Sequence, residues 1–197
     1  MAEIVVTEFM DEAAVAGLAA EFDVLYDAGL ADRPESLGDV VADCRGLIVR
    51  NRTQVRGALL QACAKLEVVG RLGVGLDNID VEACRTRGIA VCPATGANDR
   101  AVAEYVIAGV LMLLRGAYGA SAAVAAGEWP RNRLIGREIA GRRLGLVGFG
   151  GIARETARRA AALGMTVLAH DPFVAAGDPA WRALGVTRMA LEPLLES

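Results

Sequence analysis

The segment from residue 143 to residue 171 constrains the fold of this chain more than any other stretch. An apolar run of strand length leads into the sequence GFGGIA at residues 148–153, and an alanine- and arginine-rich run with helical spacing follows. A second apolar run then ends at Asp171. A strand, a glycine-rich turn, a helix, a second strand and a terminal acid, in that order, are typical of a unit that binds a dinucleotide.

The residues of the turn suit contact with a pyrophosphate. Gly148 lets the chain leave the strand sharply, with a positive φ if the turn needs one, and Gly150 lets the backbone come close to a phosphate. The amides of the following residues lie at the start of a helix, where the helix dipole favours an anion. We therefore predict that the cofactor contacts Gly148, Phe149, Gly150, Gly151 and Ile152.

Asp171 indicates which dinucleotide is bound. It lies 23 residues after Gly148, about where a carboxylate meets the adenosine ribose hydroxyls. Because a carboxylate repels a 2′-phosphate, the sequence predicts NAD rather than NADP. His170, the only histidine, is next to this acid at the adenosine end, so we expect an adenine-side or surface residue and not a catalytic acid.

Composition restricts the partners and the compartment. The 197 residues are 54% hydrophobic and 23% charged, as in a folded globular protein, and the net charge of −3 suggests neither nucleic acid nor an anionic membrane as partner. The longest apolar stretch, residues 101–114, is too short to span a bilayer, and no signal peptide is visible. The four cysteines show no metal spacing, so we expect buried reduced thiols, no metal site and a cytoplasmic protein.

Upstream of the glycine turn, strand-like and helix-like runs alternate. The strand-like runs are residues 3–9, 24–26, 46–50, 66–72 and 89–92, and the helix-like runs are residues 11–22, 35–42, 53–63 and 81–87. Such alternation predicts α/β units with parallel sheets. Turn-forming residues 93–98 mark a boundary, so we predict two doubly wound domains: a flavodoxin-like substrate-binding domain at residues 1–97 and an incomplete Rossmann NAD-binding domain at residues 98–197.

The long helix predicted at residues 99–115, with Asp99 as its cap, is apolar on nearly all sides. A helix of this kind must be buried on most of its surface. Two explanations are about equally good: the helix forms the interface of a homodimer, or it is an interior helix of its own domain.

Two further segments resemble a known family. Residues 68–80 read VVGRLGVGLDNID and residues 98–104 read NDRAVAE. Together with the glycine turn and Asp171-Pro172, they resemble the D-isomer-specific 2-hydroxyacid dehydrogenases, in particular the N-terminal portion of the phosphoglycerate dehydrogenase-like branch. The resemblance implies an NAD-dependent enzyme that interconverts a small 2-hydroxy acid and a 2-oxo acid.

The resemblance also implies substrate-binding residues. It implies that the backbone amides of Gly73, Val74 and Gly75 hold the substrate carboxylate beside the nicotinamide, so that Val74 also contacts the cofactor. Asn98 would contact substrate or cofactor at the domain boundary.

Arg50 and Arg71 match positions that meet a second anionic group of the substrate, as in 3-phosphoglycerate or 3-sulfolactate, and an arginine binds such a group through two parallel hydrogen bonds. Taken singly, either arginine is better explained as a solvated charge at a strand end, but both follow or end neighbouring parallel strands, which favours the anion-binding role for the pair. Hydroxypyruvate or glyoxylate is the alternative substrate class.

No catalytic residue is predicted within the chain. The resemblance implies an arginine, a glutamate and a histidine for the chemical step, all beyond Ser197, so we expect these 197 residues alone to be inactive. A binding or scaffolding module that keeps the cofactor turn without the chemistry is the alternative.

Overall fold

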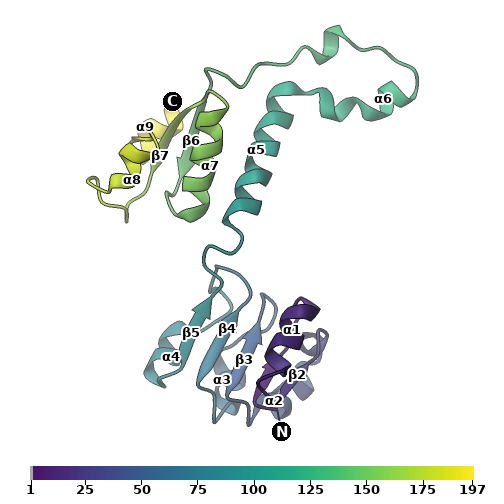
Figure 1. The fold of residues 1–197 in the computed structure, drawn as a ribbon, viewed down its shortest axis with the longest axis vertical. Helices are drawn as coiled ribbons and strands as arrows, with labels where there is room; N and C mark the ends of the chain where they lie inside the picture. Colours follow the sequence, from purple (N-terminus) through teal and green to yellow (C-terminus); the bar gives the residue numbers. More distant parts are fainter. Residues whose placement is uncertain (1) are drawn as a thin grey trace. The chain divides into compact units, whose positions relative to one another are not determined.

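A computed structural model describes residues 2–197 and divides the chain into two compact units (Figure 1). The first unit ends at Ala97 and the second spans Asn98–Ser197. Each unit is built on its own parallel sheet.

The first unit contains a five-stranded sheet in the order β2-β1-β3-β4-β5, and all of its pairings are parallel. This order is that of the flavodoxin-like doubly wound folds. Its strands are β1 (Ile4–Val6), β2 (Val24–Tyr26), β3 (Gly46–Val49), β4 (Val68–Arg71) and β5 (Ala90–Pro93). The predicted fold class is therefore confirmed for this part of the chain, although most of the strands are shorter than the apolar runs.

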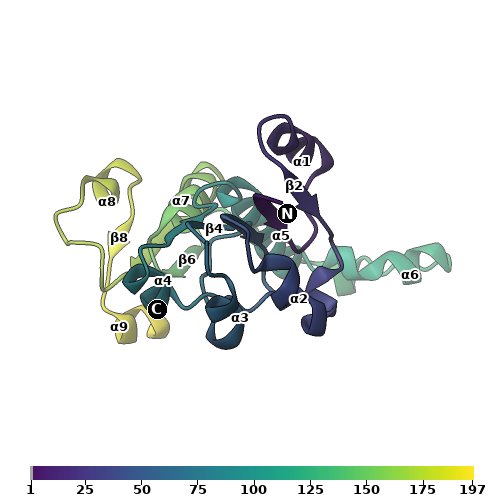
Figure 2. The same ribbon diagram turned by 90° about the horizontal axis from the view of Figure 1, so that it is seen from below.

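The helices of the first unit cover the two faces of the sheet unequally. Figure 2 shows α2 and α3 on one side of the sheet and α1 on the other. The helices are α1 (Glu12–Ala19), α2 (Pro34–Val41), α3 (Gly57–Ala62) and α4 (Val81–Thr86), and the 3-10 helix η1 spans Leu30–Asp32. Side chains from alternate strand positions, such as Leu47 and Val69, form the core with Leu37 of α2 and Leu60 of α3.

Two local predictions in the first unit are wrong. The helix expected from residue 53 begins only at Gly57, after Arg56 as its N-cap, because the amides of Arg50 to Thr53 bond to the side chain of Glu8 and hold residues 50–53 in a loop. Cys92 is exposed, whereas the other three cysteines are buried, because its side chain lies on the sheet face opposite Val69 and Val91.

The second unit contains a three-stranded parallel sheet in the order β6-β7-β8. Its strands are β6 (Arg143–Val147), β7 (Thr166–His170) and β8 (Thr187–Arg188). Its helices are α5 (Asp99–Arg115), α6 (Ser121–Ala125), α7 (Gly151–Ala162), α8 (Pro179–Ala183) and α9 (Leu191–Glu196), with 3-10 helices η2 (Ala117–Ala120) and η3 (Asn132–Leu134). The predicted unit of strand, turn, helix and strand is confirmed in β6, α7 and β7.

The core of the second unit is centred on Phe149, the second residue of the glycine turn. Its side chain is fully buried and stacks on Trp181 of α8, with ring centroids 4.0 Å apart. Arg154 of α7 lies over the Phe149 ring, 5.1 Å from its centroid, and its Nε donates to the Phe149 carbonyl. This packing fixes the turn to the core of the second unit.

Helix α5 is not an interior helix of the second unit. It packs against α7 and only Ala103 is buried, whereas Tyr105 is 80% exposed and Leu113 is 84% exposed. The predicted cap is also wrong. Asn98 is the N-cap and makes no side-chain capping bond, and Asp99 is in the first turn of the helix.

Within residues 2–197, we find no single helix long and apolar enough to cross a membrane. Only α5 and the segment Ala117–Ala125 together pass on length and composition, and they are bent by 71° relative to each other.

Candidate functional site

The predicted residues form two groups, one in each unit, and both lie at the carboxyl ends of parallel strands. The first group is the turn that follows β6. Gly148 has a φ of +97°, a conformation that L side chains rarely adopt, and its amide donates to the His170 carbonyl at 2.7 Å. No atom lies within 4 Å of where a Cβ would stand at Gly148 or Gly150, so the outer side of the turn is open.

The start of α7 offers free hydrogen-bond donors. The first amide of this region that donates to the backbone is that of Arg154, to the Gly150 carbonyl. Among the described residues, the four preceding amides, from Gly150 to Ala153, have no acceptor. Four unsatisfied amides at the positive end of a twelve-residue helix suit a phosphate.

The Asp171 carboxylate faces this turn. Its Oδ2 accepts from the Phe149 amide at 2.7 Å, and its Oδ1 accepts from the amides of Phe173 at 2.8 Å and Val174 at 3.0 Å. The Phe149 hydrogen bond, with those of Phe173 and Val174, lowers the pKa of Asp171 from its usual value and so favours the charged carboxylate. Since each carboxylate oxygen accepts two hydrogen bonds, Oδ2 retains one position for a ribose hydroxyl.

These features fit a bound NAD. They also show that Phe149 has no free group to offer the cofactor. The ring of Phe149 is buried and its amide is donated to Asp171, so the residue shapes the turn rather than offering a free group. His170 bonds through Nδ1 to the Met189 carbonyl at 3.0 Å.

Sequence reasoning missed a second carboxylate at the start of α7. A Cβ on Gly151 would overlap Asp99 Oδ2, so glycine at position 151 makes room for this side chain. The negative charge of Asp99 is therefore near the amides proposed for the pyrophosphate. No signal short of the packing of α5 on α7 could have found this contact.

The second group of predicted residues lies at the carboxyl-terminal end of the strands in the first unit's sheet. Arg71 ends β4 and pairs in register with Val49, the last residue of β3, and Arg50 follows directly. The two arginines thus end neighbouring parallel strands, as the sequence indicated.

Arg71 is folded over the backbone that follows it. Its Nη1 donates to the Leu72 carbonyl at 2.9 Å, and a Cβ on Gly73 would overlap the guanidinium. Among the described residues, its Nε is buried without an acceptor. A buried donor without a partner costs free energy, and an anion bound here would provide that partner.

The glycine loop after β4 presents fewer free amides than expected. The Gly73 amide donates to the Arg71 carbonyl at 2.8 Å, whereas within residues 2–197 the amides of Val74 and Gly75 have no acceptor. A carboxylate has two oxygens, so the two remaining amides are enough to bind it. Asp77 lies beside Gly75, with Oδ2 3.1 Å from where a Cβ would stand.

A buried acid, Glu8, holds the loop that contains Arg50. Its Oε1 accepts from the amides of Arg50 at 2.9 Å and Thr53 at 3.0 Å, and its Oε2 accepts from those of Asn51 at 3.1 Å and Arg52 at 3.0 Å. Burial raises the pKa of Glu8, but the four backbone hydrogen bonds lower it by more, so the pKa of this carboxyl group is lower than usual. The only signal in the sequence was a polar pair, Thr7-Glu8, at the end of an apolar run.

Asn78 connects the loop after β3 to the loop after β4. Its side-chain amide donates to the carbonyls of Thr53 at 2.8 Å and Arg50 at 3.4 Å. The backbone bridge between Val55 and Ile79 adds to this connection. The loops that carry Arg50 and Gly73–Gly75 are therefore one connected structure.

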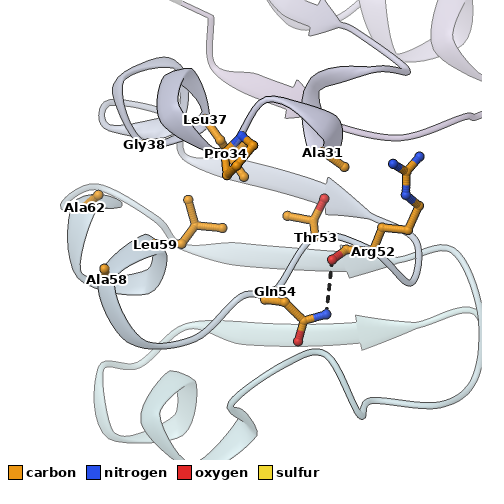
Figure 3. A pocket seen from close by; sticks show the side chains of 10 residues that line it. All are labelled: Ala31, Pro34, Leu37, Gly38, Arg52, Thr53, Gln54, Ala58, Leu59 and Ala62. Atoms are coloured by element: carbon orange, nitrogen blue, oxygen red, sulfur yellow. Dashed lines mark hydrogen bonds between the residues drawn. The ribbon is translucent and has the colours of Figure 1, made fainter.

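A cavity of about 490 Å³ opens between α2 and α3 in the same unit (Figure 3). Its walls are mostly apolar, and its polar end is formed by Arg52, Thr53 and Gln54. Arg50, Arg71 and the glycine loop do not line it, so it is separate from the predicted site. Among the described residues, no group of three or more His, Cys, Asp or Glu side chains could hold a metal ion.

The chain belongs to the D-isomer specific 2-hydroxyacid dehydrogenase family, whose catalytic-domain model matches residues 4–193. It is 58% identical over 184 residues to an (S)-sulfolactate dehydrogenase from Chromohalobacter salexigens, which covers 93% of this chain and 60% of that relative. It is 41% identical over 198 residues to D-3-phosphoglycerate dehydrogenase 2, chloroplastic, from Arabidopsis thaliana, covering 98% of this chain and 31% of that relative. The chain thus spans about a third to three-fifths of the length of these relatives.

Solved structures show the same fold. A glyoxylate reductase from Paecilomyes thermophila aligns with a TM-score of 0.82 and 27% identity, covering 98% of this chain and 61% of that one. A D-lactate dehydrogenase from Aquifex aeolicus, complexed with NAD and lactic acid, aligns with a TM-score of 0.84 and 23% identity, covering 98% of this chain and 57% of that one. The family model and the curated relatives confirm the family resemblance stated from the motifs, and the solved structures confirm the fold.

The contact between Gly151 and Asp99 can be tested by a double-mutant cycle. Gly151→Ala alone should destabilise the protein by about 1 kcal/mol, because the new methyl displaces the carboxylate, although alanine is the better helix former. In an Asp99→Ala background the same substitution should be neutral or stabilising. Urea unfolding of the four proteins gives the coupling, and strict additivity would show that the two side chains do not meet.

Proposed function

We propose that these residues belong to an NAD-dependent D-2-hydroxyacid dehydrogenase, which interconverts a 2-hydroxy acid and a 2-oxo acid. The observation that carries the proposal is the turn from Gly148 to Ile152, with its open outer side, its free amides and the Asp171 carboxylate beside it. Family membership favours this enzyme over a non-catalytic module.

In this proposal the amides at the start of α7 bind the pyrophosphate, and Asp171 Oδ2 accepts a hydrogen bond from an adenosine ribose hydroxyl. The fixed charge of Asp171 opposes a 2′-phosphate and so favours NAD over NADP. NAD, when bound, exchanges a hydride with C2 of the acid. The chain orients the acid, with the amides of Val74 and Gly75 on its carboxylate and Asn98 as a further contact.

The substrate is proposed to carry a second anion, as 3-sulfolactate and 3-phosphoglycerate do. Two observations support this: the unsatisfied buried Nε of Arg71, and the similarity to relatives named for those two acids. Glycolate or lactate would leave both arginines unpaired, and hydroxypyruvate or glyoxylate is the less favoured class for the same reason.

The proton acceptor for the hydroxyl is proposed to come from outside these 197 residues. The only histidine, His170, bonds to the Met189 carbonyl and is next to Asp171, at the adenosine end. We therefore expect the isolated chain to bind NAD without turning over a substrate. We also propose that the protein is cytoplasmic.

Replacing Asp171 tests the cofactor assignment. Asp171→Ala should weaken NAD binding about tenfold or more and reduce the discrimination against NADP, because a hydrogen bond to a charged acceptor and its repulsion of the 2′-phosphate are both lost. Calorimetric titration of both cofactors measures this. Asp171→Asn, which keeps an acceptor for the turn, separates the charge effect from loss of the fold, and an unchanged preference in both variants contradicts the assignment.

Replacing Arg71 tests the second anion. In the protein at its natural full length, Arg71→Ala should raise KM for 3-sulfolactate or 3-phosphoglycerate about tenfold with little change in kcat, because binding common to ground and transition states is lost. The kinetics of lactate serve as the control. An equal loss with lactate would remove the argument for a second anion.

We propose that the exposed apolar surface of α5 and of the segment after it is the interface of a homodimer. The large exposed side chains there are Tyr105, Met112, Leu113, Tyr118, Val124 and Trp129. A surface patch of this kind on a soluble chain marks an interaction site. The symmetric contact of two copies would bury the same patch on each.

The dimer can be tested with one charge on α5. Leu113→Glu should convert the dimer to a monomer, because the charge would be desolvated in the interface. Light scattering after size exclusion measures the mass, and Arg100→Glu, an exposed position near the start of the same helix, is the control. A monomeric unmodified protein would refute the proposal.

A further inference from the structure

The environment of Arg50 contains two residues to which neither the sequence nor the family comparison gave a role. Glu8 and Phe9 follow β1, the strand next to β3, and the register Val6↔Ile48 places them beside the residues that follow β3. The Thr7 amide donates to the Ile48 carbonyl at 3.1 Å and extends this pairing. Both residues therefore reach Arg50 from the adjacent strand.

Glu8 fixes the backbone of Arg50. Its side chain is only 3% exposed, and four amides, from Arg50 to Thr53, fill both positions on each of its oxygens. The structure places no cation beside this carboxylate among the described residues, so the amides alone offset the cost of burying the charge. Because its acceptor positions are full, Glu8 is not available as a base for a substrate.

The same loop is held from its other side. Thr53 Oγ1 shares a hydrogen bond of 2.8 Å with Thr7 Oγ1, and Asn78 donates to the carbonyls of Thr53 and Arg50. The backbone on both sides of the loop is thus bonded to groups that are themselves buried. The side chain of Arg50 therefore extends from a loop whose backbone is held in place.

Phe9 supports the guanidinium of Arg50. The Cζ atom of Arg50 lies 6.0 Å from the centroid of the Phe9 ring, at the outer limit of a cation–π contact. The ring is 63% exposed, so packing of the core does not explain its position. An exposed aromatic ring beneath an exposed arginine restricts where the charge can lie.

We infer that Glu8 and Phe9 are positioning residues for Arg50, and that together they set the enzyme's preference for acids with a second anion. An arginine side chain loses rotamer freedom when it binds, and one that is already held loses less. Glu8 holds the backbone from which Arg50 extends, and Phe9 holds its guanidinium. The inference rests on the proposed function, because it needs Arg50 to meet the second anion.

The Phe9 side of the inference is tested by kinetics on the protein at its natural full length. Phe9→Leu should raise KM for 3-sulfolactate or 3-phosphoglycerate about two- to fivefold, the size of an exposed cation–π contact, and leave kcat and the kinetics of lactate unchanged. Phe22→Leu, a half-exposed phenylalanine after α1, is the matched control and should have no effect. In an Arg50→Ala background, Phe9→Leu should add nothing.

The Glu8 side is tested by hydrogen exchange, which reports the loop without relying on activity. In Glu8→Gln the amides of residues 50–53 should exchange at least about tenfold faster, because one acceptor oxygen becomes a donor. Exchange in α4 should stay unchanged, which shows that the unit is still folded. The same variant should raise KM for the doubly anionic acids by more than Phe9→Leu does.

The outcomes separate the two proposals. If Arg50→Ala leaves the substrate preference unchanged, the proposed anion site is wrong and the inference falls with it. If Arg50→Ala does change the preference, but Phe9→Leu and Glu8→Gln affect lactate equally or still act without Arg50, only the inference is overturned.

Discussion

The carboxyl ends of parallel strands leave backbone amides that need acceptors, and the whole candidate site depends on how those amides are satisfied. A buried amide without a partner costs about as much as a lost hydrogen bond. This chain provides two carboxylates for the purpose, Glu8 after β1 and Asp171 after β7. Each binds three or four amides of loops next to its own strand.

The amides that these acids do not reach are the ones we assign to ligands. They are the four at the start of α7 and the two of Val74 and Gly75. The same physical requirement thus produces the rigid part of the site and its binding part. Asp99 lies beside Gly151, close to the free amides, but within residues 2–197 its carboxylate accepts no hydrogen bond from them.

Much of the site was predictable because its parts are local in sequence. The positive φ of Gly148 and the placing of Asp171 at the turn follow from a strand, a tight turn and a helix within thirty residues or so. The neighbouring positions of Arg50 and Arg71 follow from the rule that adjacent parallel strands have their carboxyl ends on the same side of the sheet. The substrate and cofactor roles of these residues remain proposals.

The predictions that were wrong concern contacts between segments distant in sequence. Helix α3 begins at Gly57 and not at residue 53, because Glu8, more than forty residues earlier, binds the amides of residues 50–53 and holds them in a loop. Helix α5 is apolar as predicted, yet its side chains Tyr105 and Leu113 are exposed in the described chain. The composition of a helix shows that its apolar surface must be covered, but it does not show which segment or partner covers it.

By itself the sequence determined the order of the elements, the parallel α/β architecture, the family and the turn that fits a dinucleotide, because strand length, helical spacing and glycine act over a few residues each. Only the tertiary structure decided which amides are free and which are taken. It also decided that Arg71 lies over Gly73 with an unsatisfied Nε, and that Glu8 and Phe9 lie beside Arg50. The physical reason is that hydrogen bonding and packing at the carboxyl ends of the strands connect loops that are tens of residues apart in the sequence.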